Sequence, residues 1–175
     1  MSVQARATPH VIAADVADAV VVTHDRELHL VERDGLTLTP QTSVDGARRL
    51  FEVGFEPSAD TLLVGGVDEV ALLDAAFDLG ALGTASQLVG LADTMIAMTV
   101  AYVTERRQFG VPIGSFQAVK HHLADALLRT EFARPAVLRA AATTDDRGPE
   151  RARHVSTAKA MPSDAALQTA KAALQ

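Results

Sequence analysis

The chain of 175 residues contains no cysteine and no tryptophan, and only 4% of its residues are aromatic. The absence of cysteine excludes disulfide bonds, thiolate catalysis and Cys-ligated metal sites. With so few aromatic residues, a core must be built from Ala, Val and Leu, which suits closely packed helices. The apolar content of 48% is enough for a sizeable core, so we do not expect a disordered chain.

Positive charge and long apolar runs are also scarce. The formal net charge of -6 argues against nucleic acid as the main partner, because a phosphate backbone requires a basic surface. No run of 18 or more apolar residues is free of polar interruption, so we expect no membrane span. The first ten residues, MSVQARATPH, lack the apolar segment of a secretory signal. A cytoplasmic protein is therefore expected.

Short apolar runs broken by turn residues occupy residues 8–66 and indicate strands. Asp34-Gly35 lies between two such runs and predicts a hairpin, because glycine tolerates a positive φ. In residues 51–55, FEVGF, apolar side chains alternate with Glu and Gly, which predicts a half-buried strand.

Residues 67–175 are expected to form three long helices. The first, from about residue 67 to 107, is rich in Ala, Leu, Met and Val and contains no proline. The second is expected to begin with Ser115 as its N-cap, and the third to run from about residue 149 to 175. The expected apolar face of the second helix comprises Val119, Leu123, Ala126, Leu127 and Phe132.

This order of strands followed by helices predicts an α+β fold. We expect a partial β-barrel or sheet segment over residues 1–66, followed by an antiparallel bundle of three long helices over residues 67–175. A β segment this short leaves exposed sheet edges unless another segment completes it. The N-terminal unit is therefore expected to be incomplete.

The junction between the first two helices reads ERRQFGVPIGSFQ, residues 105–117. Its arginine pair and the N-terminus of the following helix could together bind an anion, such as the phosphates of a cofactor. A basic pair at a helix C-terminus is also explained by the helix dipole alone.

The junction and its flanking helices resemble the C-terminal helical domain of acyl-CoA dehydrogenases. R-x-x-F-G at residues 106–110, P-I-x-x-x-Q at residues 112–117 and L-A-D at residues 123–125 are close to diagnostic in this order and spacing. Ala158-Lys159 resembles the family's next helix, and the segment from His10 is similar to its middle β domain. The resemblance implies a flavoprotein of lipid metabolism in which dimers share FAD sites.

Carried over residue by residue, the resemblance implies a set of FAD contacts. Arg106 would contact the pyrophosphate, for which an always-charged, planar guanidinium is suited. Phe109 and Phe116 would pack near the adenosine end, although plain core packing also explains them. Solvated positions likewise explain Gln117 and Gln175 without a ligand. The implied cofactor-binding residues are Arg106, Gln108, Phe109, Phe116, Gln117 and Gln175.

The substrate side departs from the family pattern. Family members often carry an Asp, and an Arg three residues later, early in the first long helix, where both contact the CoA part of the substrate. Here Phe77-Asp78 matches, but the arginine position is Ala81. Asp78 is therefore a candidate substrate contact, with a solvated or helix-capping carboxylate as the alternative.

No catalytic base can be assigned from the sequence. In the family, a carboxylate removes the α proton of the thioester while the β hydrogen leaves as hydride to the flavin. That base often follows a Gly-Gly segment beyond the position of Gln175. Some relatives place it on the first long helix, where Asp74, Asp78 and Asp93 offer no convincing match. We therefore expect a fragment or trimmed subunit that lacks the first family domain and half of the second.

Three hypotheses follow. The chain is part of an FAD-dependent acyl-CoA dehydrogenase, a non-catalytic subunit that completes a partner's FAD site, or a flavin-dependent monooxygenase of the same fold. The resemblance implies a homodimer, tetramer or heterotetramer, with an electron-transfer flavoprotein as acceptor. We expect no metal site, because His121-His122 lack convergent ligands, and we expect His154 at the surface.

Overall fold

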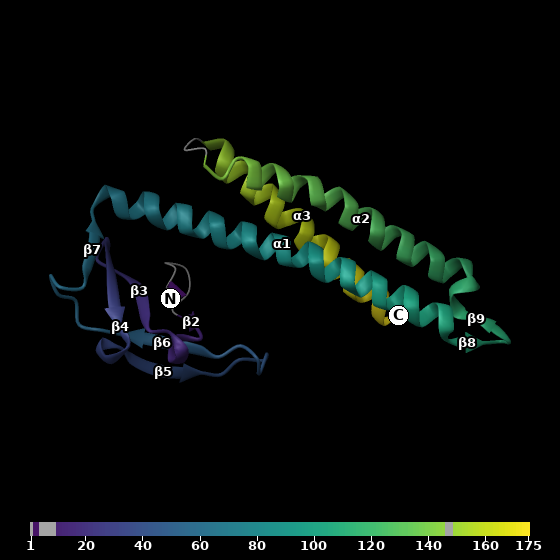
Figure 1. The fold of residues 1–175 in the computed structure, drawn as a ribbon, viewed down its shortest axis with the longest axis horizontal. Coiled ribbons are helices and arrows are strands. Elements are labelled where there is room, and N and C mark those ends of the chain that lie inside the picture. The colour runs from purple at the N-terminus through teal and green to yellow at the C-terminus, as the bar shows by residue number, and fades with distance from the viewer. Residues whose placement is uncertain (1, 4–9, 146–148) are drawn as a thin grey trace. The chain divides into compact units, whose positions relative to one another are not determined.

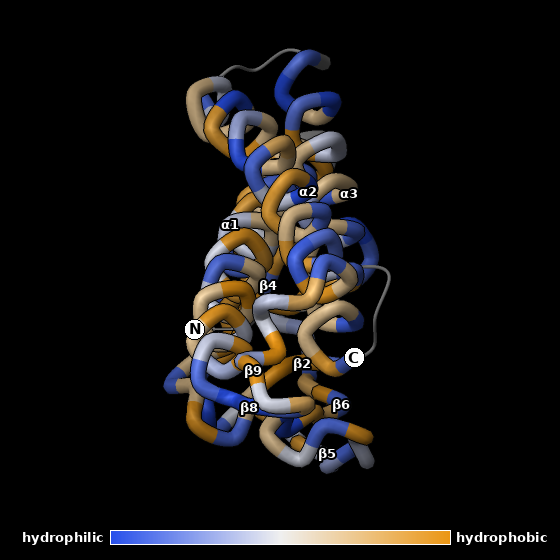
Figure 2. Tube along the Cα trace, turned by 90° about the vertical axis from the view of Figure 1, so that its right-hand side faces the viewer, coloured by the Kyte–Doolittle hydropathy of each residue, from blue (hydrophilic) through white to orange (hydrophobic). Residues whose placement is uncertain are grey.

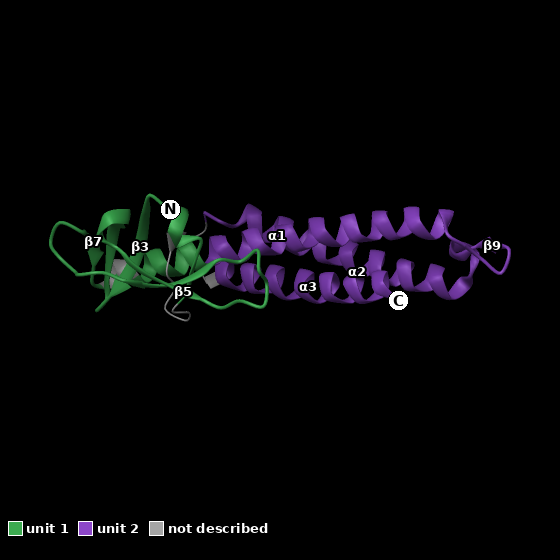
Figure 3. Cartoon of the chain, turned by 90° about the horizontal axis from the view of Figure 1, so that it is seen from below, with its two compact units in different colours: residues 1–77 green, residues 78–175 purple. Residues whose placement is uncertain are grey.

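The computed structural model describes residues 2–3, 10–145 and 149–175. The chain divides into two compact units, Met1–Phe77 and Asp78–Gln175, which Figure 3 shows in different colours. The boundary predicted after residue 66 immediately precedes helix α1 (Val67–Glu105), whereas the compact units divide within this helix. The predicted domain boundary therefore stays a prediction.

The first unit is built from two sheets. One has the strand order β1-β3-β4-β7 and the other β2-β6-β5. All pairs are antiparallel except β1 with β3, and the sheets do not close into a barrel within the described residues. The prediction of a sheet segment is confirmed. The described strands are β1 (Ser2–Val3), β2 (His10–Ile12), β3 (Ala19–His24), β4 (Glu27–Glu32), β5 (Thr37–Gln41), β6 (Leu50–Gly54) and β7 (Leu62–Gly65).

The hairpin predicted at Asp34-Gly35 is wrong. Residues Arg33–Gly35 form a short 3-10 helix that connects β4 to β5, and these two strands belong to different sheets. The tight hairpin instead joins β3 to β4 at Asp25 and Arg26, whose φ values are 43° and 66°. Two successive positive φ values match the twist of paired strands. The sequence signal is weak because neither turn residue is glycine.

The core of the first unit is formed by β-branched and small residues. Phe51, Val53 and Phe55 are half-buried and pack against this core, which confirms the alternation predicted for residues 51–55. The strand observed there, β6, begins one residue earlier at Leu50. The fully buried members are Val11, Ala14, Val20, Val22 and Val31.

Three long helices make up most of the described part of the second unit, as predicted (Figure 1). They are α1, α2 (Gln117–Ala142) and α3 (Pro149–Leu174). Between α1 and α2 lie β8 (Arg107–Gln108), β9 (Val111–Pro112) and a 3-10 turn (Ile113–Ser115). The core that joins the three helices comprises Ala85, Val89, Val137, Ala140, Val155 and Ala158.

Two predictions about α2 are wrong. Phe116 occupies the N-cap position without a side-chain cap, because Ser115 lies within the 3-10 turn and donates its hydroxyl to the Pro112 carbonyl at 2.7 Å. The predicted apolar face is confirmed at Ala126, which is buried, but wrong at Leu127 and Phe132, which are 46% and 70% exposed. Toward the C-terminus of α2, small side chains line the buried face, because they allow the helices to approach closely. That face comprises Ala126, Thr130, Ala133, Val137 and Ala140.

Helix α1 is unusually apolar along its length (Figure 2). Between Leu79 and Thr104 its single charged residue is Asp93. By length and composition alone, Val70–Glu105 could cross a membrane, and 17% of its most apolar window is buried. One such helix is weak evidence, because core helices of soluble proteins pass the same test. The absence of a membrane span stays a prediction.

Candidate cofactor site

A short hairpin projects from the end of α1. Arg107 pairs with Pro112 and Gln108 with Val111, and the turn between them consists of Phe109 and Gly110 at φ values of 53° and 81°. The backbone of Arg106 is fixed on both sides. Its N–H donates to the Tyr102 carbonyl and its carbonyl accepts from the Ile113 N–H, each at 2.8 Å. The predicted junction is therefore an ordered hairpin, with Arg106 at its base.

The two aromatic side chains of the junction contact each other. The rings of Phe109 and Phe116 are 6.1 Å apart and meet edge to face, at 81°. Phe109 is 92% exposed, so its ring adds little to the core. A left-handed backbone costs a non-glycine residue roughly 1–2 kcal/mol. An exposed phenylalanine in a strained conformation is better explained by a binding role than by stability of this chain.

The guanidinium groups of Arg106 and Arg107 have N–H donors that make no hydrogen bond with a described residue. The Arg106 side chain is exposed and makes no hydrogen bond or ion pair with any residue that the structure describes. Arg107 makes one long hydrogen bond, from Nη2 to the Gly110 carbonyl at 3.5 Å. The Gln108 amide donates to the Arg107 carbonyl at 2.9 Å. The same short segment thus carries free guanidinium donors and two exposed rings, the kinds of groups that bind a pyrophosphate and an adenine.

Gly114 fixes the hairpin against the end of α1. A Cβ at this position would lie 3.0 Å from the Val103 carbonyl oxygen and 3.1 Å from Val103 Cγ2. The chain therefore needs a glycine here to bring the 3-10 turn against the helix backbone. Val103 is buried by this approach, at 8% exposure.

The remaining predicted cofactor residues lie at the same end of the helical unit. Gln117 is the first residue of α2, and Gln175 follows the last residue of α3. These two helices are antiparallel, as the Arg129–Asp164 and Thr143–His154 contacts require. The start of α2 and the end of α3 therefore lie together (Figure 1). Both glutamines are exposed, and their cofactor role stays a prediction.

Asp78 lies at the opposite end of the helical unit. It is 27 residues before Glu105 on α1, which corresponds to about 40 Å along the helix axis. Its Oδ2 accepts a hydrogen bond from Arg151 Nε at 2.8 Å, and the two side chains are only 14% and 22% exposed. The alternative of a solvated or helix-capping carboxylate is therefore wrong. Sequence reasoning missed Arg151, because it lies 73 residues away on another helix.

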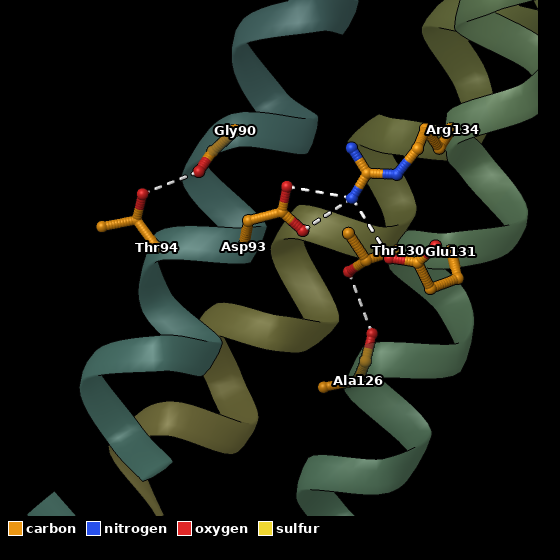
Figure 4. A network of polar contacts seen from close by, with 7 residues as sticks. All are labelled: Gly90, Asp93, Thr94, Ala126, Thr130, Glu131 and Arg134. Carbon is orange, nitrogen blue, oxygen red and sulfur yellow. Dashed lines mark hydrogen bonds and ion pairs between the residues drawn. The ribbon is translucent and has the colours of Figure 1, made fainter. Parts of the chain in front are cut away.

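Asp93 is also engaged by an arginine (Figure 4). Arg134 Nη2 donates to both Asp93 oxygens at 3.0 Å and to Glu131 Oε1 at 3.1 Å. The hydrogen bond that Arg134 donates to Glu131, followed by those it donates to Asp93, raises the pKa of Arg134. Asp93 thus connects α1 to α2. Asp93 can be recognised in the sequence because it is the single charged residue between Leu79 and Thr104 of an apolar helix.

The other polar candidates do not form a site. Neither Asp78 nor Asp93 is a free carboxylate, and no group of three metal-ligating side chains occurs among the described residues. His121 and His122 are exposed, as expected. The surface position predicted for His154 is wrong. Its ring is 18% exposed, and Nδ1 lies 3.0 Å from Thr143 Oγ1, because α3 packs on the end of α2 there.

Comparison with known proteins identifies the family. Residues 70–175 match the family model described as acyl-CoA dehydrogenase, C-terminal domain. The chain belongs to the acyl-CoA dehydrogenase family. This confirms the resemblance seen in the sequence, and the family's members are FAD-dependent oxidoreductases.

The chain is similar to several longer acyl-CoA dehydrogenases. It is 37% identical over 147 residues to acyl-CoA dehydrogenase IpdE2 of Mycolicibacterium smegmatis, covering 84% of this chain and 44% of that protein. The butyryl-CoA dehydrogenase structure from Megasphaera elsdenii matches with TM-score 0.80 and 25% identity, covering 94% of this chain and 47% of that one. The ChsE4–ChsE5 complex from Mycobacterium tuberculosis matches with TM-score 0.75 and 23% identity, over 99% and 50%. The chain thus spans about half the length of the proteins that it matches.

Proposed function

We propose that this chain contributes the C-terminal part of an FAD site in an acyl-CoA dehydrogenase. The observation that supports the proposal is the hairpin, which combines free guanidinium donors with an exposed, strained Phe109. Such a group of side chains adds little to the stability of the chain itself. It does provide the charge and the aromatic surface that a dinucleotide cofactor requires.

Each side chain of the hairpin has a separate task in this proposal. Arg106 neutralises the pyrophosphate, and its fixed backbone limits the entropy lost on binding. Phe109 and Phe116 cover the adenine and exclude water from it. Gln117, at the start of α2, contributes a neutral donor. When bound, FAD supplies the acceptor for the hydride that leaves the β carbon of an acyl-CoA thioester.

The α proton of the substrate needs a base, and we assign none among the described residues. Asp78 and Asp93 each accept a hydrogen bond from an arginine, so neither is a free carboxylate available to take a proton from a substrate. Asp78 also lies far from the hairpin along α1. The base is therefore proposed to belong to another part of the enzyme.

A second function, the non-catalytic subunit of a heteromeric enzyme, is favoured by one observation. Ala81 stands where the family pattern has a CoA-binding arginine, and the neighbouring Asp78 is paired with Arg151 instead. The chain would then complete the FAD site of a different subunit without a substrate site of its own. Similarity to a complex whose two components have different names supports this alternative.

The FAD content of purified protein tests the role of the hairpin. Arg106→Ala in the full-length protein removes a charged hydrogen bond worth roughly 1.5–3 kcal/mol, so we expect FAD binding to weaken about 10- to 150-fold. Arg139→Ala is the matched control, because Arg139 is an exposed arginine of α2 outside the hairpin. Equal FAD occupancy in both variants would exclude Arg106 from the site.

Anaerobic titration with acyl-CoA separates the functions. Loss of the visible absorbance of bound flavin on addition of a saturated acyl-CoA supports a dehydrogenase. If flavin binds only when a second, different subunit is co-expressed, the non-catalytic subunit is supported. Bound flavin that responds to NADH or NADPH, and to no acyl-CoA, supports a monooxygenase and contradicts the dehydrogenase proposal.

A further inference from the structure

A buried histidine lies beside the edge strand that leads into α1. His29 of β4 is 1% exposed. It pairs with Leu62 of β7, whereas Leu28 pairs with Val64, so Leu63 is the extra residue of a β-bulge. A bulge disrupts the ladder of hydrogen bonds between two strands. Because β7 is short and α1 begins two residues after it ends, the attachment of β7 to β4 also holds the start of that helix.

The Nδ1 atom of His29 fixes the turn before β7. It lies 2.9 Å from Thr61 Oγ1, and the same hydroxyl donates to the Ser58 carbonyl at 3.0 Å. A hydroxyl has a single proton to donate, so Thr61 must then accept a hydrogen bond from Nδ1–H. The backbone adds a second link, because the Leu30 N–H donates to the Thr61 carbonyl at 2.9 Å.

The Nε2 atom of the same ring faces a carboxylate. It lies 3.3 Å from Glu27 Oε2, and it is itself shielded from water. A neutral ring protonated on Nδ1 would turn the Nε2 lone pair toward this oxygen. A neutral ring protonated on Nε2 would need the Thr61 proton at Nδ1, and Ser58 would lose its donor. Protonation of both nitrogens satisfies Glu27, Thr61 and Ser58 together.

We infer that His29 is a proton-dependent latch that holds β7 against β4. The protonated ring donates to Thr61 and Glu27 at once, and the neutral ring gives up one of the contacts. Burial of a charge is unfavourable unless the charge is paired and hydrogen-bonded, and these two partners supply both. Because the latched state binds the extra proton, the latch is complete at low pH and weakens as the pH rises. Histidine changes its charge between about pH 5 and pH 8.

Glu27 is the carboxylate that makes the latch depend on charge. The other histidine nearby, His24 of β3, has its ring centroid 6.4 Å from that of His29 and pairs with Asp25 at 3.4 Å. Phe55 packs on the His29 ring at 5.2 Å and carries no charge. Strand β7 has no charged residue. The charged residues of the loop before β7 are exposed, and they are Glu56 and Asp60.

Nuclear magnetic resonance of the full chain measures the ring directly. The ¹⁵N chemical shifts of Nδ1 and Nε2 distinguish the doubly protonated ring from either neutral tautomer. We expect both nitrogens of His29 to carry a proton at about pH 5.5 and one nitrogen to carry it at about pH 8. A His29 ring that is neutral at about pH 5.5 overturns the proposal. The latch lies in the first unit and does not depend on the proposed function.

Amide hydrogen exchange tests whether ring protonation holds the strand. After correction for the intrinsic exchange rate, the Leu30 amide should exchange about 10-fold more slowly at about pH 5.5 than at about pH 8, because a charged hydrogen bond is gained. Glu27→Gln should bring this ratio close to one. Glu27 is 45% exposed, so the variant should remain folded.

His24→Gln is the matched control, because His24 is a histidine of the neighbouring strand that is 48% exposed and does not contact Thr61 or Glu27 among the described hydrogen bonds and ion pairs. It should leave the ratio of Leu30 exchange rates unchanged. Equal protection of Leu30 at both pH values in the wild-type chain overturns the latch. So does a ratio that Glu27→Gln leaves unchanged, or one that His24→Gln abolishes.

Discussion

Arg151→Met tests whether the Asp78–Arg151 contact is a buried ion pair that joins α3 to α1. The two groups are 2.8 Å apart, and their side chains are 22% and 14% exposed. At an effective dielectric constant of about 20, two unit charges at this distance attract by roughly 6 kcal/mol. Desolvation offsets most of this attraction, and charged hydrogen bonds contribute about 1.5–3 kcal/mol net. Arg151→Met should therefore lower the free energy of unfolding by about 1.5–3 kcal/mol.

Urea unfolding, followed by the helical circular dichroism signal, measures the change. A cycle of Arg151→Met, Asp78→Asn and the double variant isolates the coupling between the two side chains. The double variant should be more stable than the sum of the single effects predicts, because no partly buried charge is left unpaired. Since about 1 kcal/mol shifts Tm by roughly 2–4 °C in a chain of this size, Arg151→Met should lower Tm by about 3–12 °C.

Arg153→Met is the control on the same helix. Arg153 pairs with Glu150 at 3.0 Å, but these side chains are 69% and 51% exposed. Solvent screening limits exposed pairs to about 0.2–1 kcal/mol. If Arg151→Met and Arg153→Met destabilise the chain equally, burial does not strengthen the Asp78 contact and the reasoning is refuted.

Further substitutions test the glycines, the β3–β4 turn and the α1–α2 contact, each by the urea midpoint. Gly90→Ala should stabilise by roughly 0.8–1 kcal/mol, because nothing lies within 4 Å of the added Cβ in a helix interior. Gly114→Ala should destabilise the chain by about 1–3 kcal/mol, because the added Cβ would press on the Val103 backbone. A Gly114→Ala variant more stable than Gly90→Ala would contradict both predictions. Arg26→Gly should stabilise by about 0.5 kcal/mol, because a left-handed φ of 66° costs arginine more than the entropy lost by glycine; a lower midpoint would contradict this. Asp93→Asn should lower the midpoint by less than Arg151→Met does, because Asp93 is the more exposed carboxylate.

The sequence predicts the features that depend on local pattern. The spacing of residues 106–117 identifies the family, because the motif lies within one short segment. The sequence predicts a helix junction at these residues, but not the β8–β9 hairpin that forms it. Helix lengths follow from apolar periodicity, and all three helices are observed close to their predicted ends. The strand at residues 51–55 follows from alternation for the same reason.

Long-range contacts and side-chain size explain the errors. Asp25 and Arg26 form the tight turn without glycine, so composition favours Asp34-Gly35 instead. Apolar character alone does not distinguish Phe132 on an exposed face from Ala133 in the core. His29 is 1% exposed and lies 2.9 Å from the hydroxyl of Thr61, a partner 32 residues away that no local pattern indicates.

Asp93, the single charge in the central part of α1, helps to determine where the hairpin lies. The hydroxyls of Thr84, Thr94 and Thr104 donate to carbonyls of their own helix, so they offer no polar contact to a neighbouring helix. A helix that is apolar over seven turns can shift along its axis by one turn at little cost. Asp93 and Arg134 remove that freedom, because a shift of one turn, about 5.4 Å, would break their contact. The axial register of α1, and with it the position of Arg106, therefore rests on this contact together with the Asp78–Arg151 ion pair.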